Sequence, residues 1–179
     1  MQECRVSTVC GLFGPVTVVE TKNGVRNVDE DDGARQFLRE MRGELMRLPG
    51  EAESAKEFEA YFAGKLHVFS APLDPCGTEF QQRVWREAAR VPYGELLTYG
   101  ELALRIGTRG FRSVGQALRR CTLGYIVPCH RIVGANGPGG GIDLSQRRAL
   151  LEFEGISWPA DWPDVPPSEF DRSGQECYK

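Results

Sequence analysis

Short β-prone runs separated by polar turns make up the first part of the chain. They occupy residues 6–10, 16–21 and 25–28, and Asn23-Gly24 between the last two favours a hairpin turn. Apolar residues then recur at helical spacing over residues 34–48. Ser54-x-x-Glu57 has the form of a capping box before a second helix. This order predicts a small sheet-plus-helix lobe over residues 1–73.

The pattern changes to helices after residue 73. Thr78-x-x-Gln81 and Thr98-x-x-Glu101 have the form of capping boxes, and apolar spacing predicts a further helix over residues 111–120. A short turn containing glycine joins the last two helices, which is typical of a helix-turn-helix. The fold class is therefore α+β: an N-terminal lobe, a mainly helical C-terminal domain over 74–158 whose helix-turn-helix makes it a candidate DNA-binding domain, and a Pro-rich acidic tail over 159–179.

The uneven distribution of charge changes this picture. The whole chain carries a net charge of −3, which argues against a protein that coats nucleic acid by bulk charge. Residues 76–158, however, hold eleven arginines and no lysine, and arginine suits forked contacts with phosphate. Five of them crowd into the predicted helix-turn-helix: Arg105, Arg109, Arg112, Arg119 and Arg120. A solvated charged face is the alternative interpretation.

Several classes of protein fit the sequence poorly. No stretch approaches the roughly 20 apolar residues of a membrane helix, and the N-terminus makes a poor secretory signal. We therefore expect no membrane partner, and a cytoplasmic or nucleoid-associated protein (nuclear in a eukaryote). The chain has no Cys-x-x-Cys pair and two histidines, so we expect no metal and no cofactor. A site formed by Cys4, Cys10 and Cys76 with His67 stays open as an alternative.

The candidate reactive centre is Pro128-Cys129-His130-Arg131, between β-prone residues 125–127 and 132–133. A thiolate rather than a thiol attacks an electrophile, and a neighbouring histidine or arginine lowers a thiol pKa. Adjacent residues in a strand point to opposite sides, so Cys129 and His130 would need a bridging water or a bend at Pro128. The alternative is a buried structural cysteine beside a core histidine.

The segment VPCHRIVG at residues 127–134 resembles the active-site motif of the O6-alkylguanine-DNA alkyltransferases, also called methylated-DNA–protein-cysteine methyltransferases. Further segments are similar to this family in the family's order, so that the resemblance covers roughly residues 55–156. They are GTEFQQRVW at 77–85, VPYGE at 91–95, TYGELA at 98–103, RSVGQAL at 112–118 and RALLEFEG at 148–155.

The resemblance implies a DNA repair protein that acts once per molecule. Cys129 would accept the alkyl group from O6-alkylguanine, with O4-alkylthymine as a further substrate, in double-stranded DNA after base flipping. His130 would deprotonate Cys129 through a water, and Glu154 would orient His130. Tyr99 would assist rotation of the target phosphate and donate a proton towards the departing guanine. We expect such a protein to act as a monomer.

The resemblance also implies how DNA is held. Arg112 would fill the gap left by the flipped nucleotide, and a helix face with little side-chain bulk would enter the minor groove. The implied DNA-binding residues are Arg112, Ser113, Gly115, Ala117, Arg119 and Thr98. The implied substrate pocket comprises Ile132, Gly139, Gly140 and Gly141.

Two features depart from the family pattern. Cys121-Thr122 replaces the asparagine-proline hinge between the helix of residues 111–120 and the reactive segment. If Cys121 and Cys129 lie close, their oxidation to a disulfide is a hypothesis. The glycine-rich loop at 134–143 is shorter than is usual and has no tyrosine.

Two other functions compete with alkyl transfer. An alkyltransferase-like protein binds alkylated DNA without transfer, and such relatives usually lack the reactive cysteine, so the presence of Cys129 favours transfer. A thiol-switched helix-turn-helix regulator would bind a specific sequence, usually as a dimer, but the sequence contains no dimerising heptad repeat.

Overall fold

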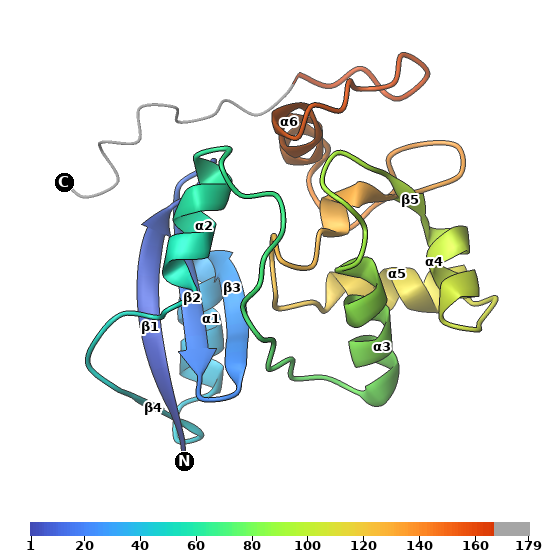
Figure 1. Cartoon of the computed structure of the whole chain (residues 1–179). Helices are drawn as coiled ribbons and strands as arrows, with labels where there is room; N and C mark the ends of the chain where they lie inside the picture. The colour runs from blue at the N-terminus through green and yellow to red at the C-terminus, as the bar shows by residue number, and fades with distance from the viewer. Residues whose placement is uncertain (167–179) are drawn as a thin grey trace. The chain divides into compact units, whose positions relative to one another are not determined.

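The computed structural model describes residues 1–166, and the predicted tail at 159–179 lies mostly outside the described residues. The chain divides into two compact units (Figure 1). The first comprises Met1–Cys76 together with Thr122–Gly124, and the second comprises Gly77–Cys121 and the described residues from Tyr125 onward. The sequence-based boundary at residue 73 lies near this division, but it did not assign residues 122–124 to the first unit.

A four-stranded sheet forms the first unit, in the order β3-β2-β1-β4. β1 and β2 are antiparallel, as are β2 and β3, whereas β4 runs parallel to β1. The hairpin turns at residues 22–23, and Gly24 begins the next strand with φ +130°, a conformation that favours glycine. The strands are β1 Gln2–Cys10, β2 Pro15–Thr21, β3 Gly24–Glu30 and β4 Leu45–Arg47.

The single helix predicted over residues 34–48 is wrong. Helix α1 spans Asp31–Glu40, and the chain then turns through Gly43, with φ +94°, into β4. Phe37 and Leu38 of α1 and Leu45 of β4 all pack against the buried residues Cys4, Val6 and Val19. These residues have helical spacing in the sequence because they pack into the same core, and not because they belong to one continuous helix.

Helix α2, Ala55–Phe62, begins where predicted but without the predicted capping box. The Ser54 hydroxyl donates instead to the Glu20 carboxylate at 2.7 Å, and Glu57 accepts the backbone N–H of Ser70 at 2.8 Å. Glu20 follows Val19 in β2, and successive side chains in a strand point to opposite faces. α1 and α2 therefore cover opposite faces of the sheet (Figure 1).

Three helices that pack on one another form the base of the second unit: α3 Glu79–Ala88, α4 Tyr99–Arg105 and α5 Phe111–Arg119. The capping boxes Thr78/Gln81 and Thr98/Glu101 are both present, as predicted. The buried Trp85 indole donates to the Ala117 carbonyl at 2.8 Å, which fixes α3 against α5. The predicted helix-turn-helix is α4, a turn at residues 106–110, and α5.

The reactive segment connects these helices to the last one. The β-prone residues 125–127 form a turn, with Tyr125 at φ 65°, so the strand predicted there is wrong. A 3-10 helix, η1, spans Cys129–Arg131, so Cys129 and His130 do not project from opposite sides of a strand. Strand β6, Ile132–Val133, pairs in parallel with β5, Leu97–Thr98, and α6 spans Leu144–Phe153.

Two general features of residues 1–166 bear on function. No helix in this range is both long enough and apolar enough to cross a bilayer. The same range contains no group of three or more His, Cys, Asp or Glu side chains arranged to hold a metal ion, so Cys4, Cys10, Cys76 and His67 form no such group there.

Candidate active site

Cys129 is half-buried, at the first position of η1. Its Sγ lies 3.8 Å from the Leu118 carbonyl oxygen, which also accepts the backbone N–H of Cys121 at 3.0 Å. A side-chain hydrogen bond from Cys121 lowers the pKa of the Cys129 thiol; burial acts in the opposite direction, and the positive charge of Arg147 lowers the pKa further. The two thiols therefore lie close together, as the sequence suggested.

Arg147, on α6, holds the reactive turn in place and was not predicted from the sequence. Its side chain is buried, and one terminal nitrogen donates to the carbonyls of Cys129 at 3.3 Å, His130 at 2.9 Å and Ile132 at 2.8 Å. The other donates to the Gly140 carbonyl at 3.2 Å. One guanidinium thus joins the reactive turn to the glycine-rich loop and places a positive charge beside the sulfur.

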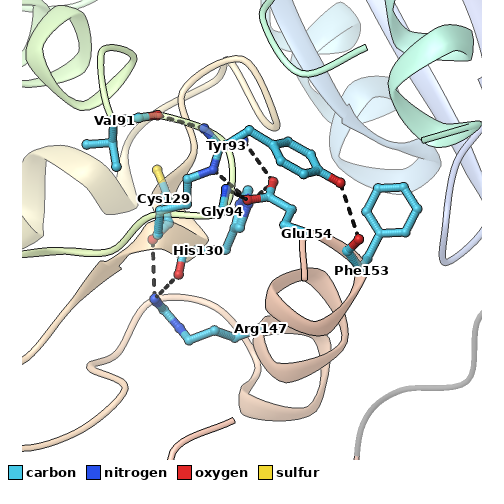
Figure 2. A network of polar contacts seen from close by, with 9 residues as sticks. Val91, Tyr93, Gly94, Cys129, His130, Arg147, Phe153 and Glu154 are labelled. Carbon is cyan, nitrogen blue, oxygen red and sulfur yellow. Dashed lines mark hydrogen bonds and ion pairs between the residues drawn. The ribbon is translucent and has the colours of Figure 1, made fainter. Parts of the chain in front are cut away.

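A buried charge network supports the other side of the turn (Figure 2). His130 Nε2 lies 2.8 Å from one carboxylate oxygen of Glu154, and Arg131 donates two hydrogen bonds to the same carboxylate at 2.7 and 2.8 Å. Burial alone would raise the pKa of Glu154, but the hydrogen bonds from His130 and Arg131 hold it well below its ordinary value. Glu154 is therefore ionised.

The ionised carboxylate decides which nitrogen of His130 carries the proton. A carboxylate only accepts hydrogen bonds, so Nε2 donates to it and Nδ1 keeps a lone pair. Burial lowers the pKa of His130, although the Glu154 carboxylate acts in the opposite direction. The lowered pKa favours the neutral ring. A neutral, oriented imidazole with a free Nδ1 is suited to accept a proton from a thiol.

Tyr99 and the glycine-rich loop form the wall opposite Cys129. The Tyr99 hydroxyl donates to the Gly140 carbonyl at 3.1 Å. Gly139 has φ +79°, and a Cβ there would lie 2.7 Å from the Tyr99 ring, so glycine is required on both grounds. A cavity of about 20 Å³ remains beside the sulfur, lined by Tyr99, Gly115, Leu118, Arg119, Cys129, Gly140, Gly141, Ile142 and Arg147.

A shallower groove of about 330 Å³ adjoins this cavity along α5. The two share Tyr99, Gly115, Arg119 and Gly140, so the groove leads to the sulfur. The remaining lining residues of the groove are Phe111, Arg112 and Gln116.

Most of the predicted site residues meet here, but four do not line the cavity or the groove. Ala117 is buried on the inner face of α5, where it contacts α3, so it is not available to a groove. Ile132 is fully buried and does not line the cavity; its carbonyl is bound by Arg147. The Thr98 hydroxyl is engaged in the α4 capping box with Glu101. Ser113 is exposed on α5 but is not among the groove residues.

Sequence reasoning missed three residues that build the site: Leu118, Ile142 and Arg147. It included Arg131 in the reactive centre as a neighbour of the thiol, whereas the Arg131 guanidinium binds the Glu154 carboxylate. No local pattern marks Arg147, since it is adjacent to another arginine, Arg148, whose side chain is 23% exposed.

Comparison with known proteins agrees with this geometry. Residues 79–156 match the family model described as "6-O-methylguanine DNA methyltransferase, DNA binding domain". Two relatives are named methylated-DNA–protein-cysteine methyltransferase. The one from Mycobacterium leprae is 49% identical over 106 residues, covering 58% of this chain and 64% of the relative. The one from Mycobacterium bovis is 48% identical over 119 residues, covering 63% and 71%.

Solved structures extend the similarity over more of the chain. The structure of Mycobacterium tuberculosis OGT in complex with DNA superposes with a TM-score of 0.71 at 38% identity, covering 89% of this chain and 96% of the other. The matched residues 79–156 include Cys129, so the class of protein is one whose DNA-binding domain contains the candidate reactive cysteine. The chain belongs to the methylated-DNA–protein-cysteine methyltransferase family.

Proposed function

We propose that this chain repairs DNA by transferring the alkyl group of O6-alkylguanine, and of O4-alkylthymine, to Sγ of its own Cys129, once per molecule. The observation that carries the proposal is a half-buried thiol with a lowered pKa at the end of an arginine-lined groove. A DNA duplex is the partner expected for that groove, and the similar protein M. tuberculosis OGT has been solved in complex with DNA.

The transfer begins with extrusion of the damaged base. An alkyl group on O6 lies inside the base stack, so the nucleotide must leave the helix, at a cost of a few kcal/mol. Arg112 is exposed on α5 in the groove and would fill the gap left behind. The cavity beside Cys129 is about 20 Å³, room for about one water, so the glycine-rich wall must move outward as the base enters.

Proton movement then follows from the buried network. The Cys129 proton passes through a water to Nδ1 of His130, while Glu154 holds Nε2 and stabilises the cation that forms. The thiolate attacks the alkyl carbon; the S–C bond forms, the C–O bond breaks, and the electron pair remains on guanine. Tyr99 exchanges its hydrogen bond to Gly140 for one to the base and donates a proton to it.

The product explains the stoichiometry. The S–C bond of the thioether product is stable, because a thiolate is a poor leaving group from an alkyl carbon, and none of the side chains that line the cavity is placed to reverse the transfer. The His130 cation loses its proton to solvent water, and the Tyr99 hydroxyl regains a proton from solvent. Each protein molecule is thus consumed by the one lesion that it repairs. We propose that it acts as a monomer without a cofactor or metal, in the cytoplasm or nucleoid, where the chromosome lies.

Peptide mass analysis tests the proposal directly. Trypsin releases residues 121–131 as one peptide that contains both Cys121 and Cys129, so fragmentation must assign the modification. After incubation with a duplex bearing O6-methylguanine, we expect one added methyl group on Cys129 and none on Cys121. Cys129→Ser is expected to bind the duplex without transfer, and Cys121→Ser to retain transfer.

The two competing functions predict different results. Binding of the lesion by a fully reduced, folded protein without any gain in mass would indicate an alkyltransferase-like binder. Binding that depends on sequence rather than on the lesion would indicate a regulator. Either result would overturn the proposal.

A further inference from the structure

An exposed aromatic side chain stands at the start of the groove. Phe111 is the first residue of α5 and is 55% exposed, among few large apolar side chains at the surface of residues 1–166. It lines the groove that leads to Cys129, and the Arg112 guanidinium lies 6.0 Å from the centre of its ring. Phe111 has no part in the proposed proton movements or in the transfer of the alkyl group.

The surroundings of Phe111 indicate the kind of partner. Arg109, Arg112 and Arg119 are exposed on or just before α5, and the first turn of that helix carries no acidic residue. An apolar protein partner would not require this positive charge, whereas a nucleic acid has both phosphates for the arginines and flat bases for the ring. The groove therefore fits a duplex better than it fits a second copy of the chain.

The position of Phe111 relative to Arg112 suggests what the ring does. Proteins that open the minor groove often insert an apolar side chain between base steps, and an aromatic ring stacks on bases of any sequence. Extrusion of a nucleotide exposes the faces of the neighbouring bases, and covering such a face offsets part of the cost of unstacking. The guanidinium of Arg112 can itself stack on a base, but it is smaller than a phenyl ring, so a second, aromatic side chain would cover more of the exposed base faces.

We propose that Phe111 and Arg112 act together as a wedge, with the Phe111 ring stacked on a base next to the flipped nucleotide. Phe111 is then a positioning residue that holds the duplex open, and not a group that touches the reacting atoms. The inference rests on the proposed function, because it requires that the chain flip a base. It predicts that the ring matters for duplex substrates in particular.

Leu104 provides a matched control for this test. It is 68% exposed on α4 and does not line the groove. Because Phe111 and Leu104 are both exposed, their replacement by alanine is expected to leave the fold intact, and thermal unfolding checks this. Single-turnover transfer is measured with a duplex bearing O6-methylguanine and, separately, with the free base O6-benzylguanine.

Phe111→Ala is expected to slow transfer from the duplex roughly ten-fold, the size of one lost base–aromatic stack, with a smaller effect on the free base. Leu104→Ala is expected to match wild type with both substrates. In Phe111→Trp, transfer from the duplex is retained, and the duplex quenches the emission of the introduced indole more than it quenches the wild-type emission.

Three outcomes overturn the inference while leaving the proposed function standing. One is transfer from the duplex by Phe111→Ala at the wild-type rate. A second is an equal loss with the free base, which would indicate a disturbed pocket. A third is a wild-type dimer in sedimentation that Phe111→Ala dissociates, which would make this face an interface between copies. Failure of the wild-type protein to transfer at all would instead refute the proposed function.

Discussion

Replacement of Arg147 tests whether one buried side chain supports the reactive turn. Arg147→Ala removes four hydrogen bonds to the carbonyls of Cys129, His130, Ile132 and Gly140. It leaves those oxygens without their charged donor and opens a cavity. At about 1 kcal/mol for each of four hydrogen bonds, the expected cost is roughly 4 kcal/mol.

Thermal and urea unfolding measure this cost. A loss of about 3 kcal/mol lowers the melting temperature of a domain of this size by roughly 12 °C or more. Arg148→Ala is the matched control: Arg148 is the next residue on α6, and its side chain is 23% exposed, pairs with Glu152 at 2.8 Å and donates to the Val165 carbonyl at 2.6 Å. A partly exposed ion pair contributes at most about 1 kcal/mol and the further hydrogen bond about 1 kcal/mol, so Arg148→Ala should cost clearly less than Arg147→Ala.

Arg147→Lys separates charge from geometry. A lysine keeps the positive charge near Cys129 but has no fork to bind several carbonyls. The pH profile of Cys129 alkylation by iodoacetamide should therefore stay close to wild type in Arg147→Lys and shift to higher pH in Arg147→Gln. If Arg147→Ala unfolds within about 1 kcal/mol of wild type, the supporting role assigned to this side chain is refuted.

Three further predictions concern the network around the sulfur. Glu154→Gln removes the ionised acceptor that orients His130. Single-turnover transfer should therefore slow by about a hundred-fold while the affinity for the duplex is retained. An unchanged rate would exclude His130 as the base. Burial lowers the pKa of His130, so as the pH falls the unfolded state takes up this proton before the folded state does. The free energy of unfolding should therefore decrease below about pH 6.5, by up to about 1.4 kcal/mol per pH unit. In His130→Gln, the free energy of unfolding measured with urea should depend less on pH in this range. Hydrogen peroxide should oxidise Cys129 to a sulfenic acid; the Cys121 thiol then attacks its sulfur, water leaves, and a disulfide forms within the 121–131 peptide. This disulfide should block transfer until an added thiol reduces it, and Cys121→Ser should not form it. Two free thiols after peroxide treatment would refute the prediction.

Local sequence patterns predicted the second unit well. Both of its capping boxes join residues three positions apart, so nothing distant was needed to form them. The helix-turn-helix follows from apolar spacing around a short turn. Cys129 and His130 were identified by a segment that resembles the family motif, and the family comparison confirmed that resemblance.

Predictions failed where a residue's partner lies far along the chain. Ser54 has the sequence of a helix cap, but Glu20 takes its hydroxyl. Residues 125–127 are β-prone, yet they form a turn. Leu45 continues a helical spacing but belongs to a strand beside β1. For Ser54 and Leu45, a tertiary contact outweighed a local preference worth about 1 kcal/mol or less.

The two kinds of unit, the helix-turn-helix and the candidate reactive cysteine could be predicted from the sequence, because each is encoded in neighbouring residues. Three features became visible only in the folded chain: Arg147 is buried among carbonyls, Ala117 faces inward, and the thiol of Cys121 lies close to that of Cys129. Burial and charge pairing depend on segments that folding brings together. The sequence of residues 76–158 contains eleven arginines and gives no sign that folding buries Arg131 and Arg147.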